Sequence, residues 1–143
     1  MAVTTTNSNH YKYQLATGNI DFQTDVFKLI LMDTSFVFDK DNHPTLASVT
    51  ANQIATGNGY TQNNATLSGI SISEDDTNDR FYASWDNLTI TASGGPIEDF
   101  TGVIVYDDTT SDDTVIFYTD LDTTVSLTDG LSFIANNISV EIS

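Results

Sequence analysis

Four aspartates lie between two apolar runs in the last third of the chain. The runs are Val103–Tyr106 and Thr114–Tyr118, and both contain the β-branched and aromatic residues typical of strands. The carboxylates of the connecting loop belong to Asp107, Asp108, Asp112 and Asp113. Hard cations such as Ca²⁺ prefer carboxylate oxygens, so these four residues are the candidate metal ligands. The alternative is a solvated acidic loop, because acidic composition alone does not set coordination geometry.

Two further segments contain the residue types of a cation site. The loop near residue 76 is either a second cation site or a solvated acidic loop. Its acidic residues are Glu74, Asp75, Asp76 and Asp79. The run Asp39–His43 begins like an EF-hand loop. Pro44 stands where that loop requires glycine, and Thr50 stands where it requires glutamate. We therefore reject an EF-hand here.

No group of residues has the pattern of a catalytic site. The chain has no cysteine, which excludes a thiol nucleophile, a disulfide framework and thiolate metal ligands. Its histidines, His10 and His43, lie in polar segments without a Gly-x-Ser-x-Gly context. The run Gly57-Asn-Gly59 lacks the lysine of a phosphate-binding loop. The sequence predicts a protein that is not an enzyme and that needs no cofactor.

The charge of the chain limits its partners. It has 143 residues, with 20 acidic and 4 basic side chains, and a formal net charge of −16. Proteins bind nucleic acids and anionic lipids through clustered lysines and arginines, so we expect neither partner. The first residues do not have the pattern of a signal peptide, and no apolar stretch reaches the length of a membrane span. We expect a soluble product.

The aromatic residues permit a binding surface for sugars. Stacking on apolar sugar faces would use Tyr60, Tyr82, Trp85 and Tyr106. The alternative is that these side chains fill the core, which is the more common role of aromatic residues.

The elements that must position these residues are mainly strands. Val26–Met32 is apolar on both faces, which favours a central strand. Arg80–Ala92 changes its phase of alternation at Asp86-Asn87, which indicates a turn or bulge there. The other predicted strands are Tyr11–Thr17, Ser35–Phe38, Ala65–Ser73, Phe100–Tyr106, Thr114–Tyr118, Thr123–Leu127, Leu131–Ala135 and Ile138–Ile142.

One short helix is predicted near residues 46–56. Thr50-Ala-Asn-Gln53 matches a capping box, and Gly57 suits a left-handed helix end. Many short strands with almost no helix favour an all-β fold. We expect an antiparallel β-sandwich, jelly-roll-like, formed by a single domain over residues 11–143. Residues 1–10 are polar and are expected to form a flexible N-terminal arm.

The chain resembles structural proteins of tailed-bacteriophage virions. The resemblance rests on four segments that keep their order from Phe27 to Phe133: KLILMDTSFVFDKDNHPTLASVTANQIATGNGYT, ATLSG, FYASWDNLTITASGGPI and VIVYDDTTSDDTVIFYTDLDTTVSLTDGLSF. One departure is Thr114-Val-Ile-Phe, where the related hairpin often has Pro-Leu-Ile. The departure preserves a strand.

The resemblance implies a function in the virion but supplies no catalytic residue. Small β-sandwich virion proteins commonly serve as capsid decoration (cement) proteins. We therefore expect a protein that is made in the host cytoplasm, binds the major capsid protein on the capsid exterior and associates with itself, as a trimer in the simplest case. The expected contact regions are Val3–His10, Asn58–Tyr60 and the acidic loop. The alternatives are a neck, tail or head-fibre component, or a carbohydrate-binding module.

Overall fold

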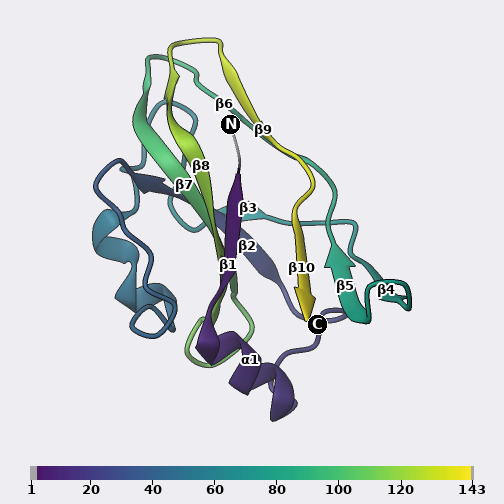
Figure 1. The fold of residues 1–143 in the computed structure, drawn as a ribbon. Helices are drawn as coiled ribbons and strands as arrows, with labels where there is room; N and C mark the ends of the chain where they lie inside the picture. The colour runs from purple at the N-terminus through teal and green to yellow at the C-terminus, as the bar shows by residue number, and fades with distance from the viewer. Residues whose placement is uncertain (1–2, 143) are drawn as a thin grey trace.

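The computed structural model describes residues 3–142 and is built around a five-stranded antiparallel sheet (Figure 1). The strand order is β1-β8-β7-β2-β3, with bounds Thr4–Asn7, Val115–Leu127, Ile97–Asp107, Phe27–Asp33 and Ala65–Thr66. A three-stranded sheet has the order β10-β5-β4, with bounds Ser139–Ile142, Arg80–Ser84 and Ser71–Asp75. A third sheet pairs β6 (Leu88–Thr91) with β9 (Ser132–Ala135). The prediction of an all-β, antiparallel, sandwich-like fold is confirmed.

Strand β2 lies inside the central sheet, as its sequence predicts. It pairs with β7 along its whole length on one side and with β3 on the other. Leu29 and Leu31 face one core, while Ile30 and Met32 face another. All four side chains are buried. A strand covered on both faces needs apolar residues at successive positions, which explains the continuous apolar run.

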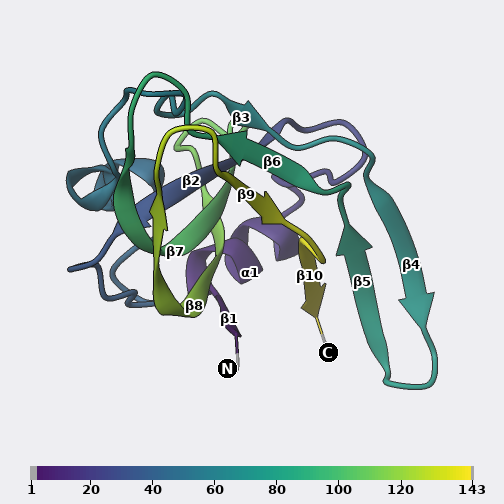
Figure 2. The same ribbon diagram turned by 90° about the horizontal axis from the view of Figure 1, so that it is seen from above.

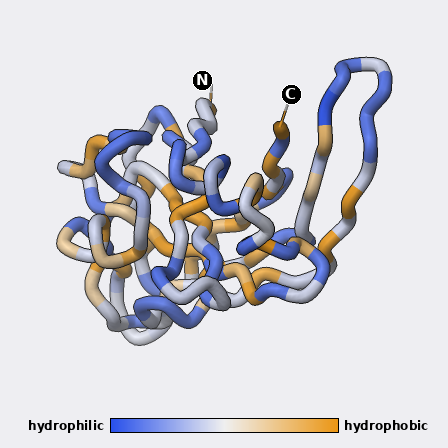
Figure 3. The backbone as a smooth tube through the Cα atoms, turned by 90° about the horizontal axis from the view of Figure 1, so that it is seen from below, coloured by the Kyte–Doolittle hydropathy of each residue, from blue (hydrophilic) through white to orange (hydrophobic). Residues whose placement is uncertain are grey.

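The two cores lie on opposite faces of the central sheet. The larger core joins that sheet to β5, β6, β9 and β10, and Phe27 packs against Trp85 with ring centroids 5.2 Å apart. The smaller core is covered by the segment from residue 34 to 54, which contributes Phe36 and Val49. Figure 3 shows the apolar stretches of the backbone concentrated inside the body of the molecule.

Residues 9–16 form the only α-helix among the described residues, and our prediction of a strand at Tyr11–Thr17 was wrong. Helix α1 spans Asn9–Ala16. The hydroxyl of Ser8 accepts a hydrogen bond from the Tyr11 amide and caps the helix. Tyr11 and Gln14 are its buried residues, with the spacing of a helix face, whereas Tyr13 is 63% exposed. The alternation of Tyr11, Tyr13 and Leu15 therefore does not reflect burial on one face.

The helix expected near residues 46–56 consists of two 3₁₀ turns, η1 (Leu46–Ser48) and η2 (Thr50–Asn52). Gln53 does not return to cap Thr50. Its side-chain amide donates to the Tyr60 hydroxyl at 2.9 Å, because both groups are buried and need partners. Ser35–Phe38 is not a strand either. Its Phe36 side chain instead covers the smaller core.

The hairpin of β4 and β5 projects from the body of the molecule (Figure 2). Most side chains of β4 are exposed, whereas Ala83 on β5 is fully buried. Strands β5 and β6 are separated by the non-strand residues 85–87, the point where the sequence predicted a turn or bulge. The segment Ala65–Ser73 was expected to be one strand, but it is divided between β3 and β4.

Part of the expected N-terminal arm belongs to the central sheet. Strand β1 pairs with β8 from Thr4↔Asp120 to Asn7↔Phe117, and the Ser8 amide donates to the Ile116 carbonyl at 2.9 Å. Backbone pairing along these residues differs from the flexible arm that their polar sequence suggested. Met1 and Ala2, which complete that predicted arm, lie outside the described residues.

Candidate functional site

The four candidate aspartates occupy the tip between β7 and β8, but they do not converge on one point. Asp108 forms an ion pair with Lys28 of β2, with Nζ and Oδ2 2.9 Å apart. Asp112 accepts from His10 of α1, with Nε2 and Oδ2 2.8 Å apart. Asp113 has a positive φ, and burial, with the charges of Asp108 and Asp112, raises its pKa. Within residues 3–142, no group of three or more acidic or histidine side chains is arranged to hold a metal.

The tip is anchored to helix α1 and is not the freely solvated loop that its composition suggested. The buried Thr114 hydroxyl donates to Asp112 Oδ1 at 2.6 Å. Gln14 Nε2 donates to the same hydroxyl at 3.3 Å. Burial alone would raise the pKa of Asp112, but hydrogen bonds from Thr114 and His10 lower it overall. The tip therefore has a defined conformation.

Asp107 has an environment different from the other three candidates. It is fully buried at the end of β7, and its Oδ1 accepts from the Thr109 amide at 2.9 Å. Its Oδ2 has no hydrogen-bond donor among the described residues. Burial, together with the neighbouring Asp25 carboxyl group, raises the pKa of Asp107 to about 7. Asp25 was not among the predicted site residues, because its only signal in the sequence is its position immediately before a predicted strand.

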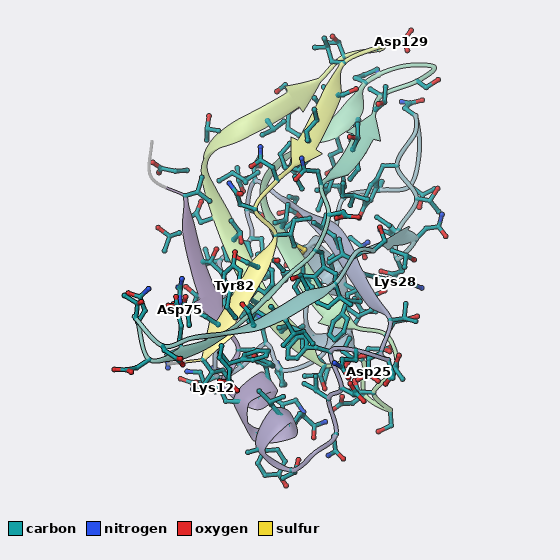
Figure 4. The ribbon with its side chains drawn as sticks, turned by 90° about the vertical axis from the view of Figure 1, so that its right-hand side faces the viewer. Lys12, Asp25, Lys28, Asp75, Tyr82 and Asp129 are labelled. Carbon is teal, nitrogen blue, oxygen red and sulfur yellow. The ribbon has the colours of Figure 1, made fainter. Side chains whose placement is uncertain are left out.

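The second acidic loop lies at the end of the projecting hairpin. Asp75 Oδ2 accepts from Arg80 Nε at 2.8 Å, and Arg80 also pairs with Glu141 of β10. Hydrogen bonds from Asn78 and Arg80 lower the pKa of Asp75. The loop is thus held by protein donors. Figure 4 shows Asp75 and Tyr82 on this hairpin.

The aromatic residues considered for sugar stacking do not form an exposed platform. Tyr60, Trp85 and Tyr106 are all buried in the cores. Tyr82 is half-buried, and its ring lies under the Arg80 guanidinium, 5.2 Å from its centroid. Three of the four rings have no free face for a sugar.

A groove separates the edge of the central sheet from the edge of the smaller sheet. It has a volume of about 450 Å³, and its walls are β1, from Thr5 to Asn7, and β10, from Ser139 to Glu141. Within residues 3–142 neither strand has a partner on its groove side. Lys12 and Lys40 also line this groove, so half of the four basic residues of the chain are here. The side chain of Asn7 donates to the Glu141 carbonyl at 3.0 Å and connects the two walls.

The groove continues into an apolar cavity of about 280 Å³ beneath β9. The two spaces share Thr5 and Ser139. Val3 and Ile134 stand at the rim of the cavity with more than half of their surfaces exposed. The sequence could not show this arrangement, because strands that lie at opposite ends of the chain form its walls.

The turn at Asn58–Tyr60 is docked against a neighbouring loop. The Asn58 amide side chain donates to the Pro96 carbonyl at 2.7 Å, and the Ser93 amide donates to the Asn58 carbonyl at 2.8 Å. Tyr60 is buried, and its hydroxyl accepts from the Leu31 amide at 3.1 Å. This expected contact region is therefore held in place by the neighbouring loop and by the larger core.

Comparisons of the chain with protein-family models, curated proteins and solved structures give no match. None of the described helices is long and apolar enough to cross a membrane.

Proposed function

We propose that this chain is a structural protein of a bacteriophage virion, and specifically a capsid decoration protein that binds the major capsid protein on the outside of the head. The observation that carries the proposal is the groove between β1 and β10. Two strand edges without a strand partner among the described residues can receive an extended segment of a partner as an added strand. The adjoining apolar cavity can receive a side chain of that segment.

The distribution of charge supports a partner that is a protein. The net charge of −16 keeps the surface away from nucleic acid and from other copies of itself before assembly. Lys12 and Lys40 both line the groove. Lys40 pairs with Asp41, whereas Lys12 forms no ion pair within residues 3–142, so its ammonium group favours a segment with a carboxylate. On a capsid, many weak contacts of this kind act together, so avidity compensates for low single-site affinity.

The resemblance to tailed-phage virion proteins gives the proposal its biological setting. The sandwich-like domain, the anchored tip and the projecting hairpin fit a structural role. A trimer around a capsid lattice axis is the expected arrangement of this class. The burial of Tyr60, Trp85 and Tyr106 argues against the alternative of a carbohydrate-binding module.

The copy number of the protein in purified particles tests the function. A decoration protein is expected in hundreds of copies, with its density distributed over the shell. Quantitative mass spectrometry and cryo-electron microscopy of the particles measure both quantities. A dozen copies or fewer at one vertex would instead indicate a neck, tail or fibre component and would overturn the decoration role.

A matched pair of variants tests the groove. The double variant Lys12→Gln/Lys40→Gln removes two positive charges from the groove. The control Thr77→Glu/Thr124→Glu changes the net charge equally, at exposed positions that do not line it. We expect only the groove variant to lose binding to capsids that lack this protein, measured by co-sedimentation. Equal loss in both variants would assign the effect to net charge.

A further inference from the structure

The buried Asp107 carboxylate lacks a hydrogen-bond donor for one of its two oxygens among the described residues. Its side chain is fully buried, and Oδ2 has no donor among residues 3–142. Oδ1 is occupied by the Thr109 amide. A buried carboxylate oxygen without a partner is strongly unfavourable, and native proteins nearly always supply a hydrogen bond, a proton or a cation. The unpaired oxygen therefore needs either a proton or a cation.

A second carboxylate is held against the first by the backbone. The Asp108 amide donates to the Val26 carbonyl at 2.8 Å, and the Val26 amide donates to Thr109 Oγ1 at 2.8 Å. These bonds fix Asp25, the preceding residue, beside the end of β7. One oxygen of Asp25, Oδ2, accepts from the Asp21 amide at 2.8 Å.

The nearby basic groups are engaged elsewhere. Lys28 pairs with Asp108, and His10 pairs with Asp112. Within the described residues, no lysine, arginine or histidine forms an ion pair with Asp25 or Asp107. Figure 4 shows Asp25 and Lys28 at the same edge of the molecule. The charged group that acts on Asp107 is the Asp25 carboxyl group, which is also acidic, so the pair lacks a cationic partner within the described residues.

We propose that Asp25 and Asp107 bind a hard divalent cation, with Ca²⁺ as the best match. Ca²⁺ accepts six to eight oxygen ligands and combines carboxylates with hydroxyl groups, carbonyls and water, so a site with two carboxylates meets its chemistry. The Thr109 hydroxyl lies at the same point of the fold and supplies a further oxygen. The cation would join the segment before β2 to the β7–β8 tip. This inference does not depend on the proposed function.

Calorimetric titration with CaCl₂ tests the site in the full-length protein, after removal of metals with a chelator and in 150 mM NaCl. We expect one saturable Ca²⁺ per chain and a higher melting temperature when it is bound. Asp107→Asn and Asp25→Asn should each weaken the affinity by at least about tenfold, since each removes a charged ligand. Circular dichroism shows whether each variant is folded. If Asp107→Asn does not fold, the affinity of Asp25→Asn alone tests the site.

The control variant is Asp76→Asn, which removes one charge at the exposed end of the projecting hairpin and should leave the affinity unchanged. Mn²⁺ as a paramagnetic probe gives an independent location, and it should broaden the amide signals of residues 25 and 107–109 first. The proposal is overturned if no saturable site is found, or if Asp76→Asn and Asp25→Asn have the same effect. If the two carboxyl groups instead share a proton, no saturable Ca²⁺ site will be found.

Discussion

At the scale of single residues, the acidic tip shows how one composition serves several purposes. Asp108 forms an ion pair with a lysine of the central sheet, Asp112 anchors the tip to α1, and Asp107 is buried against Asp25. The sequence places these aspartates within a few positions of each other. Their partners come from segments near the other end of the chain, so only the fold separates their roles.

Asp112 should contribute to stability at neutral pH and lose that contribution in acid. A carboxyl group whose pKa is lowered on folding stabilises the folded protein at pH values above its unfolded pKa of about 3.8. This stabilisation is lost as the pH falls through the pKa of the folded state. Because about a third of this side chain is exposed, we expect a contribution of at most about 1 kcal/mol. Urea unfolding of the wild type and of Asp112→Asn measures it. The two proteins should differ at pH 6 and converge near pH 2, and a constant difference would contradict the assignment.

At the scale of elements, the long hairpin of β7 and β8 is the centre of the fold, and it contains a specific close contact. Gly102 on β7 lies opposite Asp120 on β8, and the Tyr118 ring covers the glycine. A Cβ atom at residue 102 would overlap the Tyr118 side chain. The glycine is thus required by close packing and not by a positive φ.

Gly102→Ala should destabilise the protein by about 1–3 kcal/mol, the usual range for overpacking a core. Removing the ring with Tyr118→Ala should make the same glycine replacement nearly neutral, because the obstructing atoms are absent. A double-mutant cycle by chemical denaturation measures the coupling between the two positions. Additive effects of the two substitutions would show that the ring does not restrict residue 102.

Helix α1 shows where local pattern fails at this scale. The tyrosines and leucine of residues 11–15 alternate like a strand, but the Ser8 cap and the packing of Tyr11 into the larger core stabilise a helix. Strand propensity over seven residues is a weak preference that tertiary contacts override. By contrast, β2, β7 and the first part of β8 have long apolar runs, and their predicted positions agree with the structure to within a few residues.

At the scale of the whole molecule, the net charge of −16 opposes folding. Like charges are brought closer in the compact state than in the unfolded chain, and only four basic residues offset them. The described ion pairs use all of the basic side chains except Lys12, which contacts Asn9. Most of the acidic surface is therefore uncompensated.

Monovalent salt should stabilise the protein. Raising NaCl from 10 mM to 500 mM shortens the screening length from about 30 Å to less than 10 Å, so repulsion between distant carboxylates weakens. We expect the melting temperature to rise by several degrees in a chelated sample, measured by differential scanning calorimetry. A variant with four exposed aspartates replaced by asparagine should show a smaller rise. A melting temperature that falls with salt would mean that the ion pairs dominate.

The sequence by itself determined the fold class, the central position of β2 and the interruption between β5 and β6. These features depend on residue type and on neighbours within a few positions, because strand alternation and turn residues act locally. The tertiary structure alone decided the helix at residues 9–16, the groove between β1 and β10, and the meeting of Asp25 with Asp107. Each of these requires contacts between distant parts of the chain. Their formation depends on the burial of apolar surface over the whole domain, which cannot be predicted from a local sequence pattern.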